Sequence, residues 1–186
     1  MALLTDEVVR AYLSAPGEMP AAIAYARSRG LEPEWDEHAL VLRVPLLGVP
    51  APSGEEQPIA VSDIKAEHLT EPFLLEGVFD DYRVLPPIWR FLDHRDGNNI
   101  GPAAYPQPRG ASVLHGQGLI CAHFSRMAYT EYDGPHANWN GVQAWENRVE
   151  GTEALTVSDM LARLIWETRY NSQGRMSQLP PCAIAA

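Results

Sequence analysis

Apolar residues recur at helical spacing in two stretches near the start of the chain. The first stripe comprises Val8, Val9, Tyr12 and Leu13. Thr5 precedes this stripe, at the position where a capping hydroxyl accepts a hydrogen bond from the first helical turn. A second helix is predicted from Pro20, which suits a first turn, to Gly30, which ends helices in the left-handed conformation. These patterns predict N-terminal helices over residues 5–30.

The clearest helical pattern lies near the other end of the chain, in LTVSDMLARLIWE, which begins at Leu155. Its apolar stripe comprises Val157, Met160, Leu161, Leu164 and Ile165. Thr156 is a suitable N-cap, and Asp159 stands three residues later, where it completes a capping box. We therefore predict a long helix whose stripe packs against the core and does not bind a cofactor.

Apolar runs between these helices predict strands. In HALVLRVPLLGV, Leu42 and Val44 alternate with Arg43, which is typical of a strand that is half exposed to water. Two further runs cover 73–79 and 88–92, on either side of a proline pair that cannot donate to a ladder. Together the segments predict an α+β domain with a meandering antiparallel sheet of about four strands.

The intervening stretches are rich in turn residues. HRDGNNIGPAAYPQPRG is long and irregular, which in a compact domain favours a functional role. The loop between 129 and 151 contains Trp139 and Trp145, each of which would either contact a partner or cover the sheet edge. With 186 residues we expect one domain over 1–186, with a core over 35–170 and an irregular tail over 171–186.

Composition and charge restrict the class of protein. Apolar residues make up 46% and charged residues 20%, and no apolar run approaches the ~18 residues of a membrane span. A net charge of -10 disfavours nucleic acid and anionic membranes as partners. The opening MALLTDEVVR has acids where a secretory signal would be basic, so we expect a cytoplasmic protein with two free thiols. A protein or a small molecule is therefore the expected partner.

The candidate chemistry centres on Cys121 in GLICAHF. If this segment is extended, Cys121 and His123 point to one face, and an imidazolium beside a thiol favours the thiolate that attacks carbonyls. Two other interpretations compete with this one. In the first, Cys121 is an inert core residue, as many unpaired cysteines are. In the second, Cys121 binds a metal ion together with His115, His123 and His136, although the spacing of these residues matches no structural zinc pattern.

A papain-like thiol hydrolase is a further alternative. Its chemistry needs a thiol at the start of a buried helix, a histidine base and an oxyanion donor. Cys121, His136 and Gln117 would take these parts, with His123 as another candidate for the base. His136 follows the cysteine by only fifteen residues and lies within a polar loop, whereas such folds usually supply the histidine from a distant strand.

The order of the pieces is more informative than any single motif. A strand that ends in FLLEGVFDDY is followed by LPPIWRF, a long loop, GLIC, a tryptophan-bearing loop and the helix LTVSDMLARLIWE. This order resembles the ubiquitin-conjugating enzymes, whose strand meander ends in a tyrosine and a proline pair. An aromatic strand, a flap with Gly-x-Ile-Cys and a helix opened by a threonine-leucine pair then follow in that family. The matching positions are Tyr82, Pro86, Pro87, Phe91, Gly118, Ile120, Cys121, Leu155 and Thr156, the last two in reversed order.

The resemblance covers about Phe73 to Tyr170 and implies a UBC-like fold. It also implies that Cys121 accepts a ubiquitin-like modifier as a thioester from an activating enzyme and passes it to an amine of a target protein. No cofactor or metal is implied. Thiolate attack on a thioester exchanges similar bonds, so the site needs an accessible, ionisable thiol more than a strong oxyanion hole. Aminolysis then favours acidic or polar side chains nearby. A catalytically inactive, binding-only relative is the remaining alternative.

The chain also departs from the family pattern. Most eukaryotic members carry His-Pro-Asn before the cysteine, whereas GASVLHGQ has neither that proline nor that asparagine. Ser112, His115, Gln117 and His123 are the candidates to replace it, of which we favour His115 and His123. The extra leading helix and GLICAHF look more like the conjugating enzyme of the ubiquitin-fold modifier and like divergent bacterial conjugating enzymes. This resemblance implies a bacterial conjugation pathway, with antiphage defence as its setting.

Lysine usage is unusual for a protein of this composition. Lys65 is the only lysine among the 14 basic residues. An enzyme that carries an activated acyl group endangers its own amines, so the scarcity suits the implied activity, although a codon bias toward arginine explains it equally well.

Overall fold

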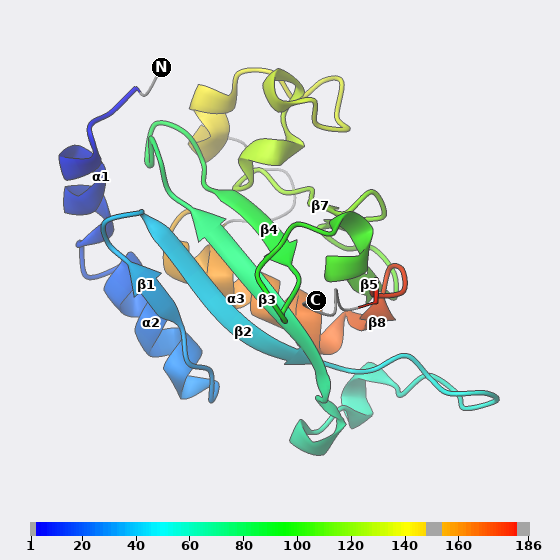
Figure 1. Cartoon of the computed structure of the whole chain (residues 1–186). Coiled ribbons are helices and arrows are strands. Elements are labelled where there is room, and N and C mark those ends of the chain that lie inside the picture. The colour runs from blue at the N-terminus through cyan, green and yellow to red at the C-terminus, as the bar shows by residue number, and fades with distance from the viewer. Residues whose placement is uncertain (1–2, 148–153, 182–186) are drawn as a thin grey trace, which may run out of the picture.

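The computed structural model describes residues 3–147 and 154–181. Four strands form an antiparallel meander in the order β1-β2-β3-β4, in which each strand pairs with the next along the chain (Figure 1). The strands are β1 (Glu34–Asp36), β2 (Val41–Gly48), β3 (Glu71–Val78) and β4 (Ile88–Leu92). The prediction of an α+β domain with a four-stranded antiparallel sheet is confirmed.

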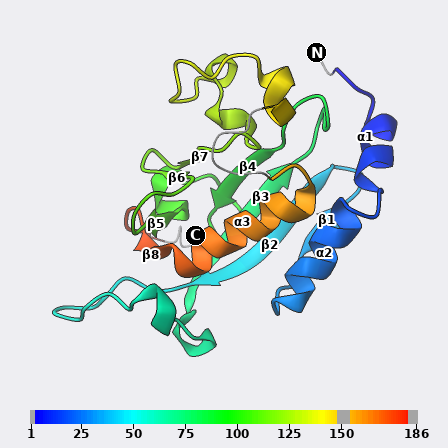
Figure 2. The same cartoon turned by 180° about the vertical axis from the view of Figure 1, so that it is seen from behind.

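The predicted helices are also present. They are α1 (Asp6–Leu13), α2 (Met19–Ser28) and α3 (Val157–Tyr170), and α2 and α3 cover the same face of the sheet (Figure 2). The hydroxyls of Thr5 and Thr156 accept hydrogen bonds from the first turns of α1 and α3, and Asp159 completes the expected capping box. Gly30 lies just beyond α2 with φ 72°, in the left-handed region.

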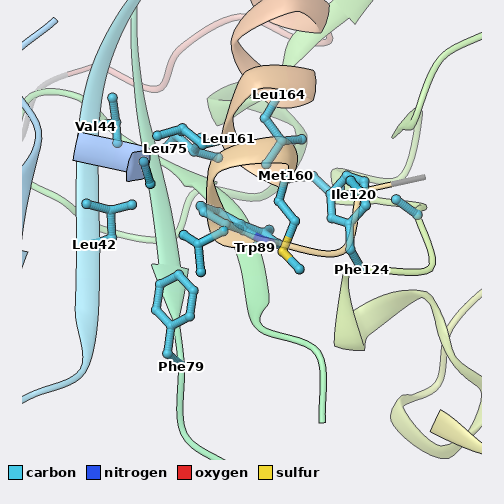
Figure 3. Packing of buried hydrophobic residues seen from close by; sticks show 14 of the residues in the cluster. Leu42, Val44, Leu75, Phe79, Trp89, Ile120, Phe124, Met160, Leu161 and Leu164 are labelled. Carbon is cyan, nitrogen blue, oxygen red and sulfur yellow. The ribbon is translucent and has the colours of Figure 1, made fainter. Parts of the chain in front are cut away.

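The core lies between the sheet and α3. Along β2, Leu42 and Val44 are buried while Arg43 is exposed, as the alternation predicts for a sheet covered on one face. Figure 3 shows these side chains facing Leu161 and Leu164 of α3. Further buried side chains that it labels are Leu75, Phe79, Trp89, Ile120, Phe124 and Met160. The segment that follows β7 therefore shares the core of the sheet and α3.

A buried carboxylate joins the two helices that cover the sheet. Glu18, immediately before α2, accepts a hydrogen bond from the backbone N–H of Val157 at the first residue of α3 (2.9 Å). The same carboxylate accepts from the Tyr82 hydroxyl (2.9 Å) and pairs with Arg83 (3.0 Å). The beginning of α3 thus has a cap from a distant part of the chain in addition to its own Thr156.

The chain between β4 and α3 is mostly irregular and includes short strands and 3-10 turns. Its strands are β5 (Pro106–Pro108), β6 (Leu114–His115) and β7 (Leu119–Ile120). The 3-10 turns of the chain are η1 (Val61–Asp63), η2 (Ala66–His68), η3 (Gly101–Ala104), η4 (Arg126–Ala128), η5 (Thr130–Tyr132) and η6 (Val142–Asn147). The first two belong to the long connection between β2 and β3, which projects from the ends of those strands (Figure 1).

The expectation of an irregular tail from residue 171 is wrong for its first part. Strand β8 (Ser172–Arg175) pairs antiparallel with β5, and Ser172 is buried. The sequence did not predict this strand because it is too short to show a periodic pattern. Its partner also lies more than sixty residues earlier in the chain. Cys182, the second thiol, lies outside the described residues.

The two tryptophans of the loop before α3 have different environments. Trp145 is 1% exposed and its indole N–H donates to the backbone oxygen of Arg83 (3.2 Å), so it is a packing residue and cannot be a partner contact in this fold. Trp139 is half-buried and lies near Cys121. Among the described residues, no helix has the length and apolar character needed to cross a membrane.

Candidate active site

A tight hairpin places Cys121 at the edge of the core. Strand β6 pairs with β7, and Gly118 in the turn between them has φ 77°. A side chain at Gly118 would also collide with Pro102, since a Cβ there would lie 2.9 Å from the proline nitrogen. Directly after β7, the backbone N–H of Cys121 donates to the oxygen of Val113 (2.6 Å). The position of the thiol is therefore fixed by backbone contacts on both sides of the hairpin.

Cys121 is half-buried, whereas its neighbours Ile120 and Ala122 are fully buried. The extended conformation expected for GLICAHF stops at Ile120, and the chain then turns, with the Ser125 N–H donating to the Ala122 oxygen (2.9 Å). The prediction that Cys121 and His123 share one face of a strand is therefore wrong. His123 is only 5% exposed, and its ring lies edge-on to Trp139.

The histidine that contacts the thiol is His136. Its Nε2 lies 2.6 Å from the Cys121 Sγ, within hydrogen-bonding distance. A neutral thiol donates in this pair and Nε2 accepts, which puts the imidazole proton on Nδ1. This is the pair named for the thiol hydrolase alternative, and the fourteen intervening residues are enough to bring the two side chains together.

Burial opposes ionisation of the thiol. Removal of Cys121 from water raises the pKa of its thiol to about 11. The resting group is therefore neutral near pH 7, and the nucleophilic thiolate forms only when a base removes the proton. His136 is the group placed to do so.

The loop that carries His136 is held by hydrogen bonds at its base. The His136 backbone oxygen accepts hydrogen bonds from the Thr130 hydroxyl and from the backbone N–H of Trp139, each at 2.9 Å. The Thr130 N–H donates in turn to the Trp139 oxygen (2.9 Å), and the Glu131 carboxylate accepts from the Gly141 N–H (2.5 Å). This network of hydrogen bonds holds the backbone of the loop next to Cys121.

Trp139 contacts both nearby imidazoles. Its ring is stacked on His136, with ring centres 4.0 Å apart and planes 18° apart. The His123 ring is perpendicular to the same indole, with ring centres 4.3 Å apart. The sequence analysis offered Trp139 only as a partner contact or a cover for the sheet edge. Its place beside Cys121 and His136 depends on the path of the loop, which no local pattern shows.

Cys121 and His136 line an open pocket of about 400 Å³. The residues around it are Ala111, Ser112, Val113, His115, Cys121, Ala122, His123, His136, Trp139 and Arg163. His115 and His123, the favoured replacements for the missing asparagine, therefore lie at the same pocket as the thiol. Gln117 is exposed in the turn of the hairpin and is not part of the lining.

Helix α3 contributes two charged groups, Arg163 in the lining of the pocket and Glu167 one turn later. The Glu167 carboxylate is fully buried, pairs with Arg163 at 2.6 Å, and accepts from the Ser112 hydroxyl and the Asn171 amide, each at 2.7 Å. The Ser112 hydroxyl therefore ties its segment to α3, and we assign Ser112 a structural role. Sequence analysis missed Arg163 and Glu167, although their spacing of four residues in a helix indicates an ion pair.

Within the described part of the chain, no three His, Cys, Asp or Glu side chains converge as a metal site requires. No family model, no curated protein and no solved structure matches this chain.

Proposed function

We propose that the protein is a conjugating enzyme of the ubiquitin-like type, with a UBC-like fold, acting in a bacterial pathway. The observation that carries the proposal is the half-buried Cys121, hydrogen-bonded to His136 at an open pocket, on the irregular segment between the sheet and α3. An activating enzyme would supply the modifier as a thioester, and a protein amine would receive it.

The arrangement of the elements supports this resemblance. A leading helical segment, an antiparallel meander, an irregular segment with the cysteine and a helix across the sheet follow one another in the expected order. Cys121 lies where the family places its acceptor thiol, immediately after Gly-x-Ile. The order matters because it puts the thiol at the edge of a rigid core, where a second protein can reach it.

The contacts define a balanced first step. As the Cys121 Sγ attacks the carbonyl carbon of the donor thioester, His136 Nε2 accepts the thiol proton. The new carbon–sulfur bond forms, the bond to the donor sulfur breaks, and the donor thiolate takes the proton from His136. The bonds exchanged are alike, so the step is close to thermoneutral.

The second step reuses the same histidine. A neutral amine attacks the thioester on Cys121, a carbon–nitrogen bond forms and the carbon–sulfur bond breaks. The proton lost by the amine reaches the departing Cys121 sulfur through His136. Among the described residues that line this pocket none carries a carboxylate, so within that part of the chain the acidic neighbours expected for aminolysis are not at the thiol itself.

The thiol hydrolase is the second candidate, because a cysteine and a histidine at 2.6 Å are what it requires. Its other requirements are less well served. The backbone N–H of Cys121, a natural oxyanion donor, is already bonded to Val113, and Gln117 lies outside the pocket. Cys121 follows a strand and precedes turns, whereas the papain-like arrangement needs the thiol at a helix start. Transfer between thioesters tolerates these features better than hydrolysis of an amide.

The test uses an unhindered acyl donor, a glycine-ended peptide thioester of 2-mercaptoethanesulfonate, with intact-protein mass spectrometry as the readout. We expect an adduct on Cys121 that dithiothreitol removes and that free lysine discharges faster than water does. Cys121→Ser should give an ester that dithiothreitol leaves intact, and Cys182→Ser should behave as the parent.

Two results would overturn the conjugating function. Catalytic release of the free peptide acid, with water outcompeting lysine, would assign the thiol hydrolase. Absence of any adduct on Cys121, in protein shown to be folded by circular dichroism, would leave the binding-only adaptor.

A further inference from the structure

The His136 ring contacts Cys121 through one nitrogen, and the described part of the chain supplies no hydrogen bond to the other. Nε2 faces the Cys121 thiol, and among the described residues no hydrogen bond reaches Nδ1. In a nucleophile–base–orienter arrangement a carboxylate or amide usually holds that nitrogen. Here the face of the ring lies instead on Trp139, with the planes 18° apart.

We infer that Trp139 is a positioning residue, which holds the His136 imidazole against Cys121 and stabilises its protonated form. The inference rests on the proposed role of Cys121 as acyl acceptor with His136 as its base. Two physical effects carry it. The stack restricts rotation of the imidazole, and the negative face of an indole attracts a cation placed over it.

The charges around the pocket make the second effect important. Besides His136, the titratable or charged side chains that line it are Cys121, His115, His123 and Arg163. Among the described residues none of these is a carboxylate, and the charge of Arg163 is compensated by its ion pair with Glu167. The buried Glu167 carboxylate contacts Arg163 and Ser112 and is not among the residues that line the pocket. Once His136 has taken the thiol proton, the Cys121 thiolate and the Trp139 ring are the groups in contact with it that favour its charge.

The indole is itself held from two sides. His123 is buried and packs edge-on against it at 4.3 Å between ring centres, and the Tyr129 ring lies 5.8 Å away at a tilt of 53°. The Tyr129 hydroxyl donates to the His123 backbone oxygen (2.9 Å), which ties this support to the segment just after Cys121. We therefore assign His123 to the support of Trp139 and His136 to the proton transfer.

The test measures alkylation of Cys121 by iodoacetamide as a function of pH, in a Cys182→Ser background that leaves one thiol. This reaction needs no modifier or activating enzyme, so its failure and the failure of the conjugating function are distinguishable. Trp139→Leu should lower the alkylation rate near pH 7.5 by about three- to tenfold. Trp139→Phe, which keeps an aromatic face, should lie between Trp139→Leu and the parent. Trp35→Phe, which removes an indole from β1, serves as the control and should match the parent.

A double-mutant cycle separates positioning from packing. In a His136→Ala background, Trp139→Leu should have no further effect, because its influence passes through the imidazole. An equal loss in both backgrounds, or no loss in either, would overturn the inference. Should Trp139→Leu fail to fold, the His136 imidazole proton signals in the NMR spectrum of the parent decide. The stack shifts them upfield by the ring current of the indole, and unshifted signals would contradict it.

Discussion

At the residue scale, the proposed chemistry depends on two opposing influences on the Cys121 sulfur. Burial raises the pKa of the Cys121 thiol to about 11, which keeps it protonated in the resting protein. His136 lies 2.6 Å away and can take the proton at the moment of attack. A thiol of this kind reacts slowly while it keeps its proton and becomes nucleophilic when attack is coupled to proton transfer to His136. That behaviour suits a carrier of acyl groups.

The influence of His136 can be measured directly. In His136→Ala the thiol has lost its base, so the reactive thiolate forms only as pH approaches the thiol pKa. Iodoacetamide alkylation of this variant should rise about tenfold per pH unit from pH 7 toward about 11. The parent should react faster than the variant near pH 7.5, and the two should converge above pH 10. Identical profiles for parent and variant would contradict a role for His136.

Acyl transfer should respond to the same substitution. Loss of a general base typically costs about 100-fold or more, so His136→Ala should slow formation of the Cys121 thioester by at least that factor. His136→Gln, which keeps a polar side chain of similar reach, serves as the matched variant. It should be as slow as His136→Ala, because an amide accepts a hydrogen bond without taking the proton. A rate restored by His136→Gln would reduce His136 to a hydrogen-bond partner.

At the scale of the elements, the site is built where a short hairpin meets the core. The turn between β6 and β7 admits only glycine at residue 118, and the Cys121 N–H is tied to Val113 across the same hairpin. Helix α3 contributes Arg163 to the lining of the pocket, and Arg163 pairs with the buried Glu167. Its first turn is held by Glu18 from the segment before α2. Displacement of either element would move the thiol relative to His136.

Gly118→Ala tests the hairpin. An alanine at this position would have to keep the left-handed backbone conformation, and its Cβ would collide with the backbone of Pro102. We therefore expect the free energy of unfolding to fall by about 1–3 kcal/mol. Acyl transfer should fall as well, since the turn positions Cys121. Gly110→Ala is the matched control, because a Cβ there meets no atom within 4 Å and its φ is not in the left-handed region. Equal effects of the two substitutions would contradict this account of the turn.

Glu18→Ala tests the link between the helices. The substitution leaves the Tyr82 hydroxyl and the Val157 N–H without their acceptor, so stability should fall by about 1–3 kcal/mol in urea denaturation. The exposed Glu32, replaced by alanine, provides a carboxylate control and should change stability by less than about 0.5 kcal/mol. A loss no larger than that of the control would mean that Glu18 does not cap α3.

At the scale of the whole molecule, the sheet and α3 form a platform with the thiol at one edge, and the connection between β2 and β3 projects from another part of it (Figure 1). Lys65, the only lysine, lies exposed in that connection and is not among the residues of the pocket. An acyl group on Cys121 therefore has no side-chain amine of its own molecule beside it. In this arrangement Cys121 can carry an acyl group without transferring it to a lysine of its own molecule.

Prolonged incubation with the peptide thioester tests that arrangement. Side-chain amide adducts should form only at Lys65, and their rate should rise with protein concentration, since the acyl group must reach Lys65 of another molecule. Lys65→Arg should abolish these adducts in peptide mapping and leave the Cys121 thioester unchanged. A rate independent of protein concentration would show that Lys65 reaches Cys121 of its own chain.

Local patterns in the sequence determined most of the regular structure. Apolar spacing and capping residues, such as Thr156 with Asp159, specify α1, α2 and α3, and alternation specifies β2, because these signals act within a few residues. They also drew attention to Cys121, although the resemblance to conjugating enzymes stays a proposal. Local patterns did not predict strand β8, because its partner β5 lies far away in the chain.

The tertiary structure alone decided which histidine serves the thiol. Sequence analysis favoured His115 and His123 as replacements for the missing asparagine and named His136 only for the thiol hydrolase alternative. The fold turns the chain after Ile120, buries His123 against Trp139 and brings His136 to the sulfur. It also placed Glu167 and Glu18 beside groups more than fifty residues away, and it placed Arg163 in the lining of the pocket that contains the thiol. Such contacts depend on how irregular segments cross the core, and the free energy that fixes those paths comes from burial and hydrogen bonds between distant segments, which no local pattern encodes.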